Sequence, residues 1–223
     1  MSGTGTRAVM PHQVTAAQLL AATRLALAGG DSFSDEALLS YLNDGVREYS
    51  QHLPRVAAIQ LLTVAGARYY ALPWDTLAVL DVRFVAGGAA LPRMNHKWLS
   101  FGRWPAYDFL PRLDLTNPPQ LLLSYDPVGG ETIEVTLQRP HAHELAAGDA
   151  LTVPAEHHHV LVQYVLFAAA RQLAAAEEAA PTGGSLLMGQ LAANARRREL
   201  AYLQALNRVL TQRQGQSATV VWG

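Results

Sequence analysis

The spacing of hydrophobic residues changes twice along this chain, and this change constrains the fold more than any other feature. From about residue 14 to residue 53 the apolar positions recur every three to four residues, as on one face of a helix. Between about 57 and 153 they alternate with polar residues, and from 155 to 213 the helical spacing returns. The pattern predicts an α+β fold, in which N- and C-terminal helices form a bundle and a small antiparallel β domain is inserted between them.

Two helices are expected before the β region and two after it. Thr15 and Gln18 have the spacing of a capping box, which predicts where the first helix begins. The second helix should end before Pro54. The other two should follow Pro154 and be separated by residues 181–184. Their lengths suit an antiparallel bundle.

Three stretches of strict alternation mark the β region. The clearest covers residues 78–84, and two more cover 121–125 and 132–138. Residues 126–130, Asp-Pro-Val-Gly-Gly, have the composition of a turn. The last two strands are therefore expected to form a hairpin.

A Pro-rich stretch from Gly87 to Gln120 has no regular period. Long loops without regular structure are usually functional or mobile. Its aromatic residues either cover one side of the small sheet or form a docking surface for a neighbouring subunit, because aromatic side chains are enriched in interface cores. The stretch contains Trp98, Phe101, Trp104, Tyr107 and Phe109. As interface residues we single out Trp98, Phe101 and Trp104.

The composition excludes several classes of protein. Half of the residues are hydrophobic and 16% are charged, so a folded chain with a sizeable core is expected. A formal net charge of −1 gives no overall attraction to nucleic acid or to an anionic membrane. The lack of cysteine excludes disulfides, thiolate zinc sites and a cysteine nucleophile. We also expect no secretion signal and no membrane span, because residues 1–11 lack an apolar core and the run 160–170 is interrupted by Gln163.

Histidines are the first candidates for catalysis or metal binding, and five of the eight are His141, His143, His157, His158 and His159. Adjacent residues on a helix point about 100° apart, so the last three cannot converge on one ion. His143-Glu144 begins an H-E-x-x-H motif, but Ala147 stands at its second histidine position. Phosphate-binding glycine loops and nucleophile elbows are also absent from the sequence. We expect no catalytic residue, no cofactor and no tightly bound metal; a metal-dependent small-molecule enzyme that uses the histidines stays the alternative.

Arginines form one local basic cluster in the last helix. Arg196, Arg197 and Arg198 are consecutive, and Arg208 and Arg213 follow. Three consecutive residues fan around a helix and cannot form a single stripe. The cluster is either a solvated or salt-bridged surface or a contact for DNA phosphates or an acidic partner, for which Arg196, Arg197 and Arg208 are the candidates.

The residues from 215 to 223 are expected to form an extended docking tail. They contain Val220, Val221 and Trp222, which are β-prone and apolar. Such a segment can bind another chain by strand addition. We therefore expect these three residues to lie in an interface with another chain.

Three local phrases accompany this order of elements. They are Tyr41-Leu42-Asn43-Asp44-Gly45 in the second helix, Tyr70-Ala71-Leu72-Pro73-Trp74-Asp75 before a strand, and a helix that opens after Val153-Pro154. From about residue 33 to 213 the layout resembles the phage head-to-tail adaptor proteins, also called head completion or neck proteins. The first phrase is similar to their L-N-D-A helix and the second to their Y-x-L-P-x-D segment. Gly45, where a good helix former is expected, and the long aromatic stretch depart from the pattern.

The resemblance implies a structural, non-enzymatic subunit of the virion neck that assembles in the host cytoplasm. In this family the subunits, often twelve, form a ring under the portal; the helical part packs subunit to subunit and C-terminal segments reach the portal. Genomic DNA passes through the lumen without sequence-specific contact. The implied partners are further copies of the chain, the portal and the next neck or tail protein, with no membrane. Another virion subunit, a tail terminator or a tail-tube protein, stays an alternative, although a tail tube should be mostly β.

Overall fold

The computed structural model describes residues 13–27, 32–94, 105–112, 116–180 and 184–217. The chain divides into two compact units. The helical unit comprises residues 1–52 and 142–223, and the β unit comprises residues 53–141. Each unit buries hydrophobic residues of its own.

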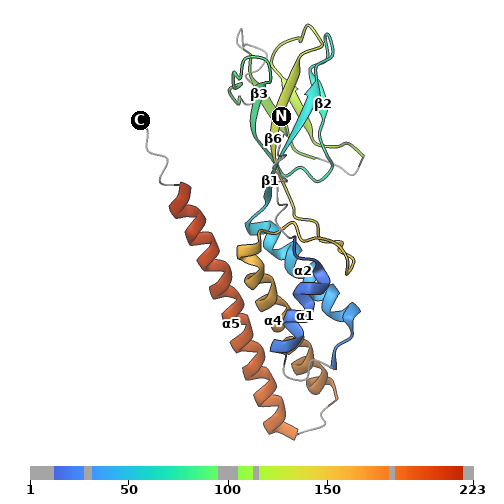
Figure 1. The fold of residues 1–223 in the computed structure, drawn as a ribbon, viewed down its shortest axis with the longest axis vertical. Helices are drawn as coiled ribbons and strands as arrows, with labels where there is room; N and C mark the ends of the chain where they lie inside the picture. The colour runs from blue at the N-terminus through green and yellow to red at the C-terminus, as the bar shows by residue number, and fades with distance from the viewer. Residues whose placement is uncertain (1–12, 28–31, 95–104, 113–115, 181–183, 218–223) are drawn as a thin grey trace, which may run out of the picture. The chain divides into compact units, whose positions relative to one another are not determined.

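The helical unit contains α1 (Ala16–Ala26), α2 (Asp35–His52), α4 (His158–Ala179) and α5 (Gly184–Ser217). A 3-10 turn, η2 (Ala155–His157), leads into α4. The central helix is α4, which contacts α1, α2 and α5 (Figure 1). The fold class predicted from the sequence, α+β with helices on both sides of a β insertion, is confirmed.

The predicted capping box begins α1. The Thr15 hydroxyl accepts a hydrogen bond from the Gln18 backbone N–H at 3.3 Å, and the Gln18 side chain accepts one from the Thr15 N–H at 2.9 Å. Arg24, near the end of α1, forms an ion pair of 2.5 Å with Asp35 in the first turn of α2. These contacts define the start of α1 and connect it to the next helix.

The apolar face of α2 packs closely on α4. Its buried residues include Leu38, Leu42, Val46 and Tyr49. Gly45 lies on the same face, and a Cβ atom added there would be 2.8 Å from Cδ1 of Tyr164. That distance is shorter than a normal carbon contact of about 3.5 Å. The glycine therefore permits the close approach of the two helices.

The stretch from Ala155 to Ala179 is long and apolar enough, by length and composition alone, to cross a membrane. The core helix of a bundle has the same character. Within the described residues α4 occupies that position, with Val160, Leu161 and Val165 fully buried. Its hydropathy therefore gives no separate argument for a membrane span.

The β unit consists of two antiparallel three-stranded sheets. The first has the order β1 (Arg55–Leu62), β6 (Thr132–Arg139), β3 (Ala78–Phe84), and the second has the order β2 (Tyr69–Ala71), β5 (Gln120–Leu123), β4 (Tyr107–Leu110). Both sheets contribute to one core, in which Ile133, Val135, Leu137, Leu121 and Leu123 are fully buried. The alternation predicted for residues 132–138 is confirmed by their burial.

The predicted hairpin is wrong. β5 pairs with β2 and β4, whereas β6 pairs with β1 and β3, so the two strands belong to different sheets. Residues 126–130 do turn, with Gly129 and Gly130 at positive φ. Their backbone bonds instead to the segment after β1, through Gly66 N–H to Pro127 O and Gly130 N–H to Thr63 O. The turn passes the chain from one sheet to the other.

The strict alternation predicted for residues 78–84 is also interrupted. The pairing of β3 with β6 shifts between Val79 and Asp81, so Leu80 is an extra residue on β3. A bulge of this kind moves the following side chains to the opposite face. As a result Val79 and Val82 are both buried, while 46% of Leu80 is exposed.

The Pro-rich stretch is more regular than expected. Tyr107 and Phe109 lie in β4 and are 2% and 8% exposed. These two aromatics belong to the core of the β unit, as the first interpretation of the stretch predicted.

Candidate interaction surfaces

Six of the predicted interface residues lie outside the described residues. They are Trp98, Phe101, Trp104, Val220, Val221 and Trp222. The tail boundary also differs from the sequence pattern, because α5 continues through Ser217. The interaction surfaces that the structure describes are therefore those of α5, the start of α4 and the β unit.

One side of α5 packs on α4. Its buried residues there follow the spacing i, i+3, i+4, i+7, which places them on one helical face. They are Tyr202, Ala205, Leu206 and Val209. The rings of Tyr164 and Tyr202 meet edge to face at 5.2 Å, which joins the two helices through aromatic contact.

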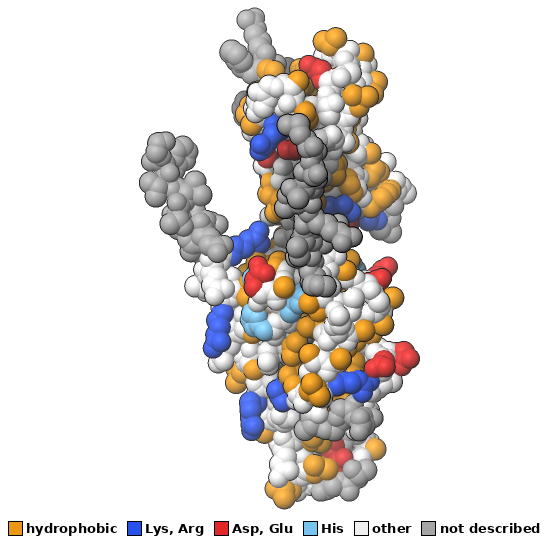
Figure 2. Space-filling model, viewed as in Figure 1, with side chains coloured by type: hydrophobic (Ala, Val, Ile, Leu, Met, Phe, Trp, Pro, Cys, Tyr) orange, Lys and Arg blue, Asp and Glu red, His pale blue; other side chains and the backbone are white. Residues whose placement is uncertain are grey.

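The other side of α5 contains the predicted arginines. Arg196, Arg197 and Arg208 are all exposed, and none of them forms an ion pair within the described part of the chain. Arg197 and Arg208 are eleven positions apart, close to three full turns, so they share a face about 17 Å apart along the axis. Basic side chains lie along this helix in the space-filling view (Figure 2). Arg196 points about 100° away from Arg197.

A shallow groove runs along the same part of α5. It is lined by Gln204, Asn207, Arg208, Thr211 and Gln212, and it encloses about 480 Å³. Four of these side chains are neutral hydrogen-bonding groups and one is a cation. Phosphate oxygens or a polar, acidic partner surface would match this chemistry.

The histidines do not come together in the structure. Nε2 of His141 lies 3.2 Å from the Leu53 carbonyl oxygen, and Nε2 of His158 lies 3.0 Å from that of Val153. Nδ1 of His159 lies 2.8 Å from the Glu156 carbonyl oxygen. Among the residues that the structure describes, no three histidine or carboxylate side chains are placed to hold a metal ion.

His157 has the most specific contact of this group. Its Nδ1 lies 2.6 Å from the Tyr49 hydroxyl on α2, which donates the hydrogen bond when Nδ1 carries no proton. Burial lowers the pKa of His157 below its usual 6.5; Glu156 opposes this shift, and His159, His158 and Arg213 add to it. Burial raises the pKa of Tyr49 to about 12. The uncharged pair therefore holds η2, which leads into α4, on α2.

We expect this contact to make the helical unit less stable in mild acid. Because the folded pKa of His157 is the lower one, the unfolded chain binds the proton more readily. The stabilisation is complete above about pH 6.5 and is lost as the pH falls through the folded pKa. Urea unfolding at ~pH 7.5 and ~pH 5 should show a smaller pH response in His157→Asn than in the wild type. The exposed His159, changed to Asn, is the control, and an unchanged response in His157→Asn would contradict the assignment.

The motif Tyr41–Gly45, described above as the first phrase, holds the segment around Leu145 on α2. The Asn43 side chain accepts a hydrogen bond from the Leu145 N–H at 3.0 Å and donates one to the Leu145 carbonyl at 3.3 Å. An amide side chain can pair with a backbone in this way because it has both a donor and an acceptor. The asparagine of the phrase therefore positions the chain that leads into α4.

The second phrase stabilises the β unit. The Tyr70 hydroxyl donates to the Ala67 carbonyl at 2.9 Å and accepts from the Val64 N–H at 3.1 Å, which closes the turn before β2. Asp75 accepts hydrogen bonds from Arg139 at 2.8 and 2.7 Å. These residues have structural roles.

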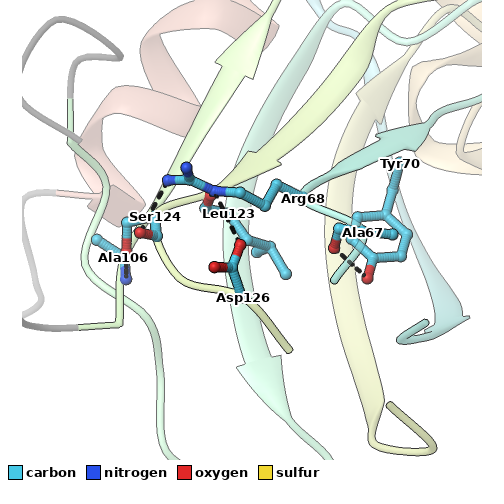
Figure 3. A network of polar contacts seen from close by, with 7 residues as sticks. All are labelled: Ala67, Arg68, Tyr70, Ala106, Leu123, Ser124 and Asp126. Atoms are coloured by element: carbon cyan, nitrogen blue, oxygen red, sulfur yellow. Dashed lines mark hydrogen bonds and ion pairs between the residues drawn. The ribbon is translucent and has the colours of Figure 1, made fainter. Parts of the chain in front are cut away.

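Beside this turn, Arg68 connects three segments of the β unit (Figure 3). Its guanidinium donates to the carbonyls of Leu123 and Ser124 at 3.2 and 2.9 Å and lies 3.7 Å from Asp126. The Ser124 hydroxyl accepts from the Ala106 N–H at 2.8 Å. The end of β5 is thereby held to the turn before β2 and to the start of β4.

The sequence interpretation missed one exposed aromatic contact. Trp74 is half exposed, and the Arg112 guanidinium lies 5.1 Å from its ring centroid. Leu77, three positions later, is exposed to the same extent. Trp74 stands inside the second phrase, but its exposure could not be read from the pattern, because its neighbours Leu72 and Thr76 are buried.

Comparison with known proteins agrees with this arrangement of helices and sheets. A search of curated proteins finds no match. The family model described as SU10 adaptor protein matches residues 14–222, which include both units and nearly the whole chain. The chain therefore belongs to the SU10 adaptor protein family, a phage head-tail adaptor family of structural, non-enzymatic virion proteins.

Proposed function

We propose that copies of this chain form a ring of twelve subunits in the virion neck. The ring joins the capsid portal to the next neck or tail protein, and genomic DNA passes through its lumen. Assembly takes place in the host cytoplasm. Family membership supports the adaptor role, and the outward side of α5 is the observation that most supports a ring.

The outward side of α5 is unusual for a helix that faces solvent. Among its exposed residues are Leu186, Leu200 and Leu203, of which Leu200 is 60% exposed. Leu200 and Leu203 are three positions apart and therefore neighbours on the helix surface. Apolar residues grouped on an exposed helix favour packing against another protein surface. In a ring the same helix of an adjacent subunit is always available.

Two exposed arginines of α5 are available for a further contact in such a ring. Arg197 and Arg208 share one face of α5, at an angle to the leucines, so a helix packed through the leucines still exposes both cations. Such a pair suits phosphate oxygens of DNA in the lumen or an acidic surface of a partner. Contact with phosphates alone would leave DNA recognition independent of sequence.

The mass of the purified chain in solution, alone and after mixing with the portal, tests the proposal. We expect a closed oligomer, and a complex in which it binds the portal. Leu200→Asp combined with Leu203→Asp should prevent oligomer formation, because two charges would be buried in the interface. Leu25→Asp on α1 is the matched control, since Leu25 is 92% exposed in the same unit. A monomer in both conditions would contradict the ring.

A further inference from the structure

The strand β1 lies at an open edge of its sheet. It pairs with β6 through eight consecutive positions, Arg55↔Arg139 to Leu62↔Thr132. No strand or bridge within the described residues pairs with its other side. An edge of this length presents a row of unpaired N–H and C=O groups.

The hydrogen-bond pattern identifies the residues that present those groups. Thr63 donates its N–H to Glu131 O and continues the β1–β6 ladder, so the odd-numbered residues of β1 bond to β6. At the two ends of β3, the N–H of Leu77 donates to Gln138 O and the N–H of Val85 donates to Thr132 O. The even-numbered residues of β6 therefore bond to the β3 side of the sheet. The backbone of Val56, Ala58, Gln60 and Leu62 is therefore directed to the open edge.

The residues of β1 themselves carry none of the usual features that prevent pairing at an edge. From Val56 to Leu62 the strand contains no charge, no proline and no bulge. Val56 and Leu62 are 54% and 64% exposed. The other edge strand of the same sheet, β3, contains a bulge at Leu80 and a bridge from Arg83 to Ala90. A long, uncharged edge without a bulge can accept an added strand.

The chain contains a segment of matching chemistry. Residues 218–222, Ala-Thr-Val-Val-Trp, are rich in β-branched residues, and no charge occurs between residues 214 and 223. The family match extends to residue 222, so the segment belongs to the part of the chain that the family shares. An uncharged strand suits an uncharged edge, because no ion is desolvated on pairing.

We propose that residues 218–222 of one copy add as a strand to the β1 edge of a second copy. This inference rests on the proposed function, which brings copies together and raises the effective concentration of each segment near its neighbour. The outward backbone of Val56, Ala58, Gln60 and Leu62 forms the new ladder. Val220 and Trp222 lie on one face of the added strand because side chains alternate.

Cysteine cross-linking between copies tests the pairing directly, since the natural chain has no cysteine. Full-length Ala58→Cys and Val220→Cys are mixed, assembled and treated with a short bismaleimide. We expect a covalent product that contains one of each variant. Leu80→Cys, on the opposite edge of the same sheet, replaces Ala58→Cys in the control and should give about tenfold less product.

A proline at the edge separates pairing from folding. Ala58 directs its N–H outward, so Ala58→Pro removes no bond of the β1–β6 ladder but blocks an added strand. With Val56→Cys as the acceptor thiol, Ala58→Pro should lower the mixed product about tenfold, and Ala58→Ser should not. Equal product in both variants would overturn the inference, and so would a link formed only within single chains.

The two proposals fail in different ways. If rings form and bind the portal but no mixed product appears, the strand inference is wrong and the ring stands. If the chain stays monomeric and no mixed product appears, both are wrong. A mixed product with the expected response to proline supports the inference in either state.

Discussion

Replacing Gly45 with alanine should destabilise the helical unit, although alanine is the better helix former. Helix propensity alone favours alanine by about 1 kcal/mol. The new Cβ, however, would lie 2.8 Å from Cδ1 and 3.1 Å from Cγ of Tyr164. The Tyr164 ring cannot turn away easily, because it packs edge to face on both Phe167 and Tyr202. Overpacking of this kind costs about 1–3 kcal/mol, and Gly45→Leu should cost more.

Gly189 on α5 is the matched control for this substitution. It is also a helical glycine, but an added Cβ there has no atom within 4 Å. Gly189→Ala should therefore raise the free energy of unfolding by up to about 1 kcal/mol. Urea unfolding followed by circular dichroism measures both variants. If Gly45→Ala were as stabilising as Gly189→Ala, the contact between α2 and α4 would not limit residue 45.

A double-mutant cycle can assign the cost to one contact. Tyr164→Ala removes the ring that the new Cβ would meet, at the expense of its own aromatic packing. In that background Gly45→Ala should no longer destabilise the helical unit, and only the gain from the higher helix propensity of alanine should remain. The departure of Gly45 from the family phrase is then explained by a large residue on the facing helix.

The sequence predicted the elements of the helical unit better than the end of its last helix. The capping box of α1 is a local contact between Thr15 and Gln18, so spacing alone reveals it. The helical spacing was expected to end near residue 213, with an extended tail from 215. The last helix continues to Ser217, because one glycine at 215 costs a helix only about 1 kcal/mol and its neighbours tolerate helical geometry.

Strand pairing could not be predicted in the same way. Turn residues at 126–130 show where the chain reverses, but they do not show which strands bond. The partner of β6 on one side is β1, more than 60 positions earlier in the chain. Pairing over such a distance is decided by burial of the shared core, where both sheets contribute. The bulge at Leu80 could not be predicted for the same reason, since it depends on the register of β3 with β6.

The exposed surfaces, too, could be predicted from the sequence only in part. The arginines of α5 form a cluster in the sequence, but which of them are exposed depends on the side that α4 covers. The contact of Asn43 with Leu145 joins residues 102 positions apart and leaves no local signal. The open edge of β1 follows from sheet order alone. The chemistry of a residue can be read from the sequence, whereas its exposure is a property of the fold.

Residues 53–141 should fold without the rest of the chain. They form one continuous segment with a core of their own, shared by both sheets. The two ends of the segment meet, because Arg55 pairs with Arg139 and His141 Nε2 lies 3.2 Å from the Leu53 carbonyl oxygen. Ends that lie together are typical of an inserted domain, and they allow a cut at both sites without opening the core.

Calorimetry of the isolated segment measures this expectation. A single cooperative transition should appear, with an unfolding enthalpy of about 60 kcal/mol near 60 °C at ~0.7 kcal/mol per residue. Val135→Asp is the control, because it places an unpaired charge at a fully buried position of the central strand and should abolish the transition. In the remaining chain, a short glycine-serine linker in place of 53–141 should keep the helical signal, since the bonds of Asn43 to Leu145 lie outside the excised part. A segment that unfolds gradually, without a heat-absorption peak, would show that the β unit depends on the helices for its stability.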